Sequence, residues 1–168
     1  MEIVTQRVIS PSTEIGKFAF HWRKALKNIV IPDSVTTIKD SAFQGAGLTS
    51  ITIPAGVTFI GREAFAHTDI SALTIPTNSS LKYIEQYAFE GTDNLKSVTL
   101  PASLEKMGTG AFLKSGLEAV VFADGIKLAE IPQKAFAETK LIAVSLPDSV
   151  TLVNHNAFNN VETLKSVT

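Results

Sequence analysis

The sequence of 168 residues contains no cysteine and only three arginines, and 18% of its residues are charged. Without cysteine the chain can form no disulfide, no cysteine-ligated zinc site and no thiol nucleophile. The net charge of −1 at pH 7 gives no basic excess of the kind that nucleic-acid binding requires, because neutralised phosphates supply most of that affinity. No apolar run approaches the ~18 residues that indicate a membrane span.

The first residues, Met1 to Arg7, lack the charged-then-apolar order of a secretory signal. Two interpretations of this absence stay open at this stage. Either the protein is cytosolic, or a leader lies upstream of this sequence. The absence of cysteine does not decide between them, since such a chain folds in either redox compartment.

An Ala-Phe dipeptide recurs seven times, with its phenylalanines spaced by 23, 22, 24, 23, 24 and 22 residues. A fixed period of this length is typical of a solenoid, in which each coil buries its apolar face only against its neighbours. Seven of the ten phenylalanines share this register, and we expect them to stack in one interior column, the phenylalanine spine: Phe20, Phe43, Phe65, Phe89, Phe112, Phe136 and Phe158.

A second motif, Leu-x-x-Ile-x-Ile-Pro, begins five or six residues after each phenylalanine. Its apolar residues alternate with period two, which predicts a short strand with one face in the core. Proline cannot donate to a strand ladder and ends the strand, and Ala123 replaces it in one copy. Strands are predicted near residues 26–31, 48–53, 70–75, 95–100, 117–122, 141–146 and 164–168.

A third element has the pattern apolar-x-x-apolar-x-x-x-Ala-Phe, as in Val35 and Ile38 before Phe43. The three-then-four step predicts a helical or 3₁₀ turn with one buried side. Together the elements predict an α/β-type solenoid of about seven coils of ~23 residues, with a parallel β-ribbon on one side and short turns on the other.

These motifs, at this period, resemble the BspA-like leucine-rich-repeat family of bacterial surface proteins, over roughly residues 12–168. The resemblance implies a right-handed horseshoe with a concave ribbon, and a function in adhesion or protein recognition at the cell surface. The family commonly has cysteine at the third position after Ala-Phe. Here that slot holds small residues: Ala46, Thr68, Thr92, Ser115, Thr139 and Val161.

Residues 1–25 form an irregular first cycle, which we interpret as a degenerate N-terminal capping coil before the array of residues 26–168. The sequence stops inside a predicted strand, residues 164–168, without a polar C-terminal cap. We therefore expect a piece of a longer array, and end-to-end self-association through the uncapped coil, because open ladder groups and apolar surface invite it.

On the open side of the predicted ribbon, two columns of side chains are small or β-branched, and none is charged or aromatic. Protein interfaces usually depend on Trp, Tyr and Arg anchors, so no local hot spot is expected here. The columns are either strand-compatible filler or a smooth trough for an extended chain or a glycan. The candidate binding residues are Asn28, Ser50, Thr52, Thr74, Ser97, Thr99 and Ser145.

Anchor-type residues occur elsewhere. Trp22, the only tryptophan, lies beside Arg23, and the two are a candidate terminal contact point. In the competing interpretation, Trp22 closes the N-terminal end of the core. Tyr83 and Tyr87 are four residues apart and could share a face of a short turn. In the competing interpretation, packing between coils accounts for at least one of them more simply.

No catalytic, metal or cofactor site is recognisable. The histidines (His21, His67 and His155) stand at unlike positions of the repeat, whereas zinc needs three or four converging ligands. Carboxylates are scattered singly, and Gly108-Thr109-Gly110 lacks the lysine of a phosphate-binding loop. The sequence thus favours a non-catalytic scaffold for protein or glycan recognition, without nucleic-acid binding or membrane insertion. The alternative is a structural spacer with no ligand.

Overall fold

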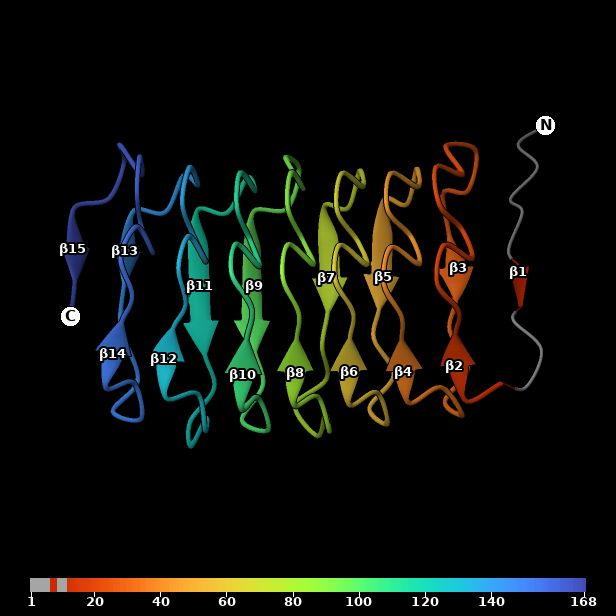
Figure 1. The fold of residues 1–168 in the computed structure, drawn as a ribbon, viewed down its shortest axis with the longest axis horizontal. Helices are drawn as coiled ribbons and strands as arrows, with labels where there is room; N and C mark the ends of the chain where they lie inside the picture. Colours follow the sequence, from red (N-terminus) through yellow and green to blue (C-terminus); the bar gives the residue numbers. More distant parts are fainter. Residues whose placement is uncertain (1–6, 9–11) are drawn as a thin grey trace.

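The computed structural model describes residues 7–8 and 12–168, which form a solenoid of parallel strands with about seven turns. The coils stand side by side along the longest axis of the molecule (Figure 1). Each complete coil consists of one strand, a corner at the proline, a second strand and a corner at Ala-Phe. The predicted parallel-strand solenoid is therefore confirmed.

The odd-numbered strands form the predicted ribbon and pair in parallel as β1–β3, β5–β7, β9–β11 and β13–β15. Along β9 exposed and buried residues alternate, and Val98 lies opposite Val120 of β11, so one face of the ribbon is in the core. We call the opposite, outward face the ribbon face. The strands are β1 (Arg7–Val8), β3 (Ile29–Val30), β5 (Ser50–Thr52), β7 (Ala72–Thr74), β9 (Ser97–Leu100), β11 (Ala119–Phe122), β13 (Ala143–Val144) and β15 (Ser166–Val167).

The even-numbered strands form a second set of parallel ladders, the second sheet. Five of them pair in the order β10-β8-β6-β4-β2, and β12 pairs with β14 (Figure 1). They are β2 (Glu14–Ile15), β4 (Thr37–Ile38), β6 (Phe59–Ile60), β8 (Tyr83–Ile84), β10 (Lys106–Met107), β12 (Glu130–Ile131) and β14 (Leu152–Val153).

The second sheet corrects the prediction of helical or 3₁₀ turns, because the described residues contain no helix and hence none that could cross a bilayer. The three-residue step from Val35 to Ile38 has another cause. Val35 closes the proline corner by donating its N–H to the Pro32 carbonyl (3.0 Å), and Ile38 then points inward from a two-residue strand. A turn followed directly by a strand therefore reproduces a helical spacing.

The phenylalanine rings form a continuous stack through the core. Consecutive ring centroids are 5.1 to 5.7 Å apart, and the planes are within 13° of parallel. The five inner rings are fully buried, whereas Phe20 and Phe158 are partly buried. Each inner ring therefore depends on the coil before it and the coil after it for its burial.

The backbone at each Ala-Phe corner divides its hydrogen bonds between two directions. In the third coil the N–H groups of Glu63, Phe65 and His67 donate to carbonyls of the next coil at 3.0, 2.8 and 2.7 Å. The intervening Ala64 and Ala66 N–H groups donate within their own coil. The corner thus leaves none of these five backbone donors without a partner, as a packed backbone requires.

This alternation needs left-handed backbone two residues before and two residues after every spine phenylalanine. At all fourteen such positions φ is between +52° and +65°. Only three of them are glycine and two asparagine, the residues that adopt this conformation most readily. The others are Phe18, Trp22, Ser41, Glu63, His67, Tyr87, Lys114, Lys134 and Glu138.

Three glycines at these positions lie beneath a ring of the preceding coil. A Cβ on Gly45 would lie 2.6 Å from the Trp22 ring, and one on Gly110 would lie 2.5 Å from Tyr87. His67 lies over Gly91 in the same way. Trp22, His67 and Tyr87 are thus each matched by glycine in the next coil, whereas Phe18 is followed by Ser41.

The slot three residues after each spine phenylalanine is buried from Ala46 onward. Where it holds threonine, the hydroxyl donates to the phenylalanine carbonyl of its own corner, as Thr92 Oγ1 does to Phe89 O at 2.9 Å. Ser115 is equally buried, but its Oγ has no hydrogen-bond partner among the described residues. The slot therefore accepts small side chains and favours those that can reach this carbonyl.

Phe89→Ala should lower the free energy of unfolding by about 3–5 kcal/mol, because a fully buried ring in the middle of the stack leaves a cavity. Chemical denaturation measures this loss. Lys127→Ala, at an exposed position, should change it by less than about 0.5 kcal/mol. Equal losses in the two variants would contradict the interior position of the spine.

Gly116→Ala should destabilise the fold by about 1–3 kcal/mol, because its Cβ would overlap the Asp93 carbonyl of the preceding coil. Gly16→Ala is the matched control, since nothing lies within 4 Å of a Cβ at that position. Thermal unfolding of the two variants should therefore differ by several degrees. An unchanged midpoint for Gly116→Ala would mean that neighbouring coils are further apart than described.

Thr92→Val should cost about 1 kcal/mol, because the shape is kept and the buried hydrogen bond to Phe89 is lost. Ser115→Ala should be neutral or raise stability by up to about 1 kcal/mol, because it removes a buried hydroxyl without a partner. Urea denaturation compares the two. Destabilisation by Ser115→Ala as large as that by Thr92→Val would show that the Ser115 hydroxyl is bonded.

Candidate functional site

All the candidate binding residues on the ribbon are exposed and lie in the two predicted columns. Asn28, Ser50 and Ser97 belong to one column, and Thr52, Thr74, Thr99 and Ser145 to the other. The remaining members of both columns are also exposed and are alanine, valine, serine or threonine. The strands thus bring residues from seven separate segments together in two uncharged columns on one face.

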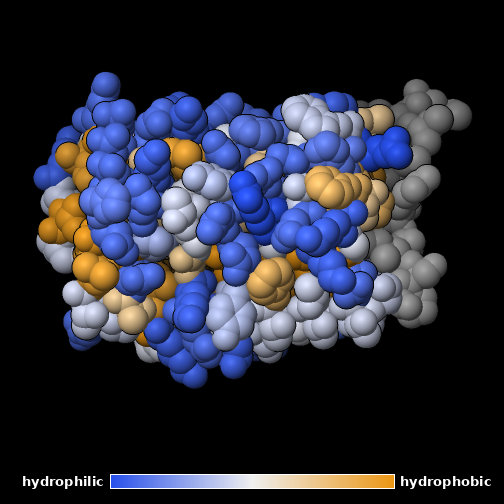
Figure 2. All heavy atoms as spheres, in the orientation of Figure 1, coloured by the Kyte–Doolittle hydropathy of each residue, from blue (hydrophilic) through white to orange (hydrophobic). Residues whose placement is uncertain are grey.

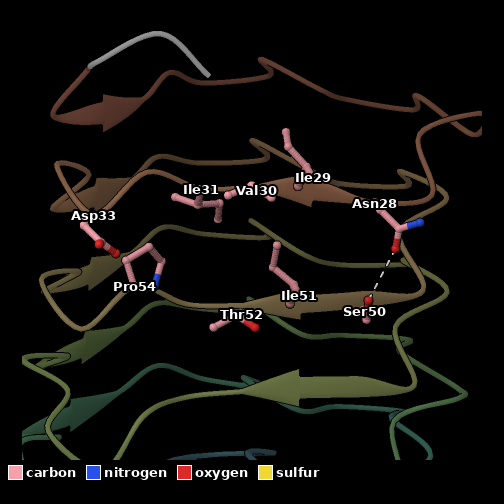
Figure 3. Close-up of a pocket in the computed structure, with 9 residues that line it drawn as sticks. All are labelled: Asn28, Ile29, Val30, Ile31, Asp33, Ser50, Ile51, Thr52 and Pro54. Atoms are coloured by element: carbon pink, nitrogen blue, oxygen red, sulfur yellow. Dashed lines mark hydrogen bonds between the residues drawn. The ribbon is translucent and has the colours of Figure 1, made fainter. Parts of the chain in front are cut away.

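Two depressions lie along the ribbon face. The first, about 580 Å³, is lined by residues of β3 and β5 and their proline corners. Asn28 and Ser50 lie side by side at one end of it, where Ser50 Oγ donates to Asn28 Oδ1 at 3.4 Å, and Asp33 and Pro54 lie at the other (Figure 3).

The second depression, about 550 Å³, is formed where β11 and β13 reach their corners. Its lining includes the exposed Val121 and Ser145, the partly buried Phe122, and Asp124 and Asp148 of the corner loops. Both depressions therefore combine side chains of the two columns with carboxylates of the corner loops. They offer hydroxyl, amide or carboxylate hydrogen-bonding groups, and no Trp, Tyr or Arg lines either of them.

The candidate contact residues Trp22 and Arg23 lie on the Ala-Phe corner of the first coil, between β2 and β3, and both are exposed. They line a third depression of about 510 Å³ together with Lys24, Phe20 and Leu26. With 53% of its surface exposed, Trp22 lies mostly outside the core, so the interpretation as an end-closing core residue fits it poorly.

The three histidines lie at unlike places. His21 is hydrogen-bonded to Gln44, His67 lies over Gly91, and His155 is exposed. Among residues 7–8 and 12–168 there is no group of three or more metal-ligating side chains that could hold an ion.

Two carboxyl groups have a lowered pKa. The hydrogen bond from Lys17 lowers the pKa of Asp40, with help from the Arg62 backbone amide, and a hydrogen bond from Lys96 lowers the pKa of Glu118. Both are ion pairs near the surface, where solvent screens them. Such lowered values keep the carboxylates charged and give no sign of an acid or base for catalysis.

An aromatic pair on the second sheet was not identified from the sequence. Phe59 of β6 lies directly opposite Tyr83 of β8, and both are half-buried on the outward face. The interpretation in which Tyr83 and Tyr87 share a turn is wrong, because Tyr83 lies in a strand. Tyr87 lies over Gly110 of the next coil, in agreement with the interpretation by packing between coils. The register of the second sheet, once known, would have revealed the pair.

Hydrophilic side chains cover much of the face shown in Figure 2, and apolar side chains gather where β13, β14 and β15 lie. Exposed apolar residues of these last coils are Ile142, Leu152, Val153 and Val167. The expected end-to-end association stays a prediction. So does the capping role of residues 1–25, of which 1–6 and 9–11 lie outside the described residues.

Stacked coils of two parallel strands, with a phenylalanine corner at each repeat, define the class of the protein as a repeat solenoid. The model of the BspA type leucine-rich repeat region matches residues 13–130 and 129–168, in six copies. The chain belongs to this family.

Solved structures of bacterial leucine-rich-repeat proteins share the fold. A Bacteroides ovatus protein is 25% identical, with a TM-score of 0.72 over 95% of this chain and 54% of its own. A leucine-rich cell surface protein of Faecalibacterium prausnitzii is 27% identical, with a TM-score of 0.56 over 95% and 52%. The pneumococcal vaccine antigen PcpA is 25% identical, with a TM-score of 0.65 over 99% and 41%.

The chain thus spans about half the length of the solved proteins that it matches, or less. No curated protein sequence matches it. The shared property is a repeat-based scaffold, which serves either binding or structure.

Proposed function

We propose that the protein is a non-catalytic recognition module that binds an extended ligand, a protein segment or a glycan, along its ribbon face. The observation that carries this proposal is the unbroken exposure of two columns of small, uncharged side chains over seven coils. A long molecule can approach such a surface closely, because no large side chain projects from either column.

The hydrogen-bonding groups of the ribbon face suit a ligand with repeated polar groups. Hydroxyls of Ser50, Thr52, Thr74, Ser97, Thr99 and Ser145 and the Asn28 amide lie in five of the coils, and the β11 coil contributes only Ala119 and Val121 between them. Each hydroxyl both donates and accepts, so the face can pair with sugar hydroxyls or with peptide groups. Affinity would come from many weak contacts in sequence rather than from one hot spot.

We place this recognition at a bacterial surface, with adhesion as its outcome. Support comes from the relatives, one of which is titled a cell surface protein and another a vaccine antigen. A structural spacer is the second candidate. The absence of Trp, Tyr and Arg from the two columns favours it, because interfaces usually concentrate their energy in those residues.

An array of glycans and host proteins tests the proposal. The wild-type chain should give saturable binding to at least one class of ligand. Thr74→Arg combined with Thr99→Arg should weaken that binding at least about tenfold, because two long cations would then project from the middle of the ribbon face.

Ala129→Arg combined with Thr151→Arg is the matched control, with the same added charge on exposed neighbours at the second sheet. It should bind as the wild type does, and circular dichroism should show both variants folded. The proposal is overturned in favour of the spacer if no ligand binds on the array. Equal binding by the ribbon variant would also overturn it, by showing that the ligand binds away from the ribbon face.

A further inference from the structure

Three rings lie together on the Ala-Phe corner of the first coil. His21 contacts Phe18 edge to face, with centroids 5.4 Å apart, and contacts Trp22 in the same manner at 6.0 Å. Phe18 is 58% exposed and Trp22 is 53% exposed. We call these three residues the aromatic platform.

This arrangement contributes little to the stability of the fold. Phe18 (φ 58°) and Trp22 (φ 53°) both have left-handed backbone, which is unfavourable for a residue other than glycine. Because both side chains are exposed, they also lack much of the stabilisation that burying a large apolar side chain contributes. Gly45 and Gly91 occupy the position of Trp22 in later coils, so the corner does not require an aromatic side chain.

The platform is nonetheless held in place. Gln44 donates from Nε2 to Glu63 Oε2 at 2.7 Å, so its Oε1 faces His21 Nε2 at 3.0 Å and accepts from it. The backbone N–H groups of Phe18 and Trp22 donate to the second coil at 3.2 and 2.7 Å. Gly45 leaves room for the Trp22 ring. Rings fixed before binding lose less entropy when a partner arrives.

The platform lies in the most basic part of the chain. No Asp or Glu occurs from Ile15 to Pro32, whereas Lys17, Arg23, Lys24 and Lys27 all do. Acids of later coils pair with two of these cations, in Lys17–Asp40 at 2.8 Å and Lys27–Asp69 at 3.5 Å.

Arg23 and Lys24 are both exposed, and among the described residues neither forms an ion pair. Lys24 Nζ lies 4.9 Å from the centroid of the Trp22 ring. Two cations beside exposed rings, in a chain with a net charge of −1, create a local positive field that attracts an anionic partner.

The depression beside Trp22 has an apolar lining of Ala19, Phe20, Ala25 and Leu26, and its charged residues are Arg23 and Lys24. None of its side chains can accept a hydrogen bond from a sugar hydroxyl. An apolar side chain flanked by carboxylates matches this lining. Trp and Arg are also the residues that most often anchor protein partners.

We propose that the aromatic platform, with Arg23 and Lys24, is a binding site for an acidic segment of a partner protein, which inserts an apolar side chain beside Trp22. The site is built from residues other than those of the ribbon face, and it does not depend on the ribbon binding a ligand.

Trp22 is the only tryptophan, so its fluorescence reports on this site alone. The probe is a short acetylated peptide in which glutamate alternates with leucine. We expect a saturable shift of the emission that weakens as salt is raised, because exposed charges are screened. The same peptide with lysine for glutamate, or with serine for leucine, should bind at least about tenfold more weakly.

Arg23→Glu combined with Lys24→Glu should reduce affinity for the acidic peptide at least about tenfold. Phe18→Ser should reduce it as well, and thermal unfolding should show that both variants remain folded. Lys127→Glu combined with Lys165→Glu makes the same change in net charge at exposed positions in later coils, and it should bind as the wild type does.

The proposal is overturned if the acidic peptide does not bind, if the lysine or serine peptide binds equally well, or if both double variants lose affinity alike. Preference for phosphatidylserine vesicles, or for a sialylated or sulfated oligosaccharide, over the acidic peptide would also overturn it. These readouts use a defined peptide, so they are independent of any ligand found for the ribbon face.

Discussion

The structure depends on one constraint, which is that each coil must complete the hydrogen bonds and the burial of its neighbour. At the Ala-Phe corner every second N–H points to the next coil, and the left-handed residues on both sides of the phenylalanine make this possible. The same corner delivers the ring to the interior stack. Backbone pairing and apolar packing therefore require the same spacing, so neither can shift without the other. A substitution that disturbs one coil therefore weakens its packing against both neighbouring coils, as expected for a solenoid.

This constraint leaves some positions fixed and others open to change. Gly47, Gly61, Gly108 and Gly116 lie where backbone of the preceding coil leaves no room for a Cβ. The left-handed positions are less restricted in residue type, because nine of the fourteen hold residues other than glycine or asparagine. Most of their side chains are exposed or partly exposed at the corner, and Ser41 is buried. Variation at the corner therefore changes the surface while the stack stays the same.

The parts of the fold that follow from buried apolar residues could be predicted from the sequence. The phenylalanine period and the period-two alternation indicated the coil number and the ribbon, because both patterns arise from burial. The second sheet could not be read in this way. Its strands have two residues each, too few to show alternation, and the step from Val35 to Ile38 spans a turn and a strand. The left-handed backbone of the corner could not be predicted either, because lysine and glutamate, as at Lys134 and Glu138, do not indicate a positive φ in a sequence. The ribbon columns were placed correctly on an exposed face, but sequence alone could not show where that face is hollowed.

The two candidate surfaces differ in the physical basis of binding, and this difference follows from the repeat. On the ribbon, the two columns repeat small or β-branched side chains every 22 to 25 residues. A ligand on these columns would be held by weak contacts accumulated along its length. At the corner, glycine in one coil makes space for a ring from the coil before, as Gly45 does for Trp22. Anchors that the two ribbon columns lack are therefore present at the corner. In a solenoid of this type, extended contact and local anchoring are expected on different faces, and the first coil shows the clearest case of the second.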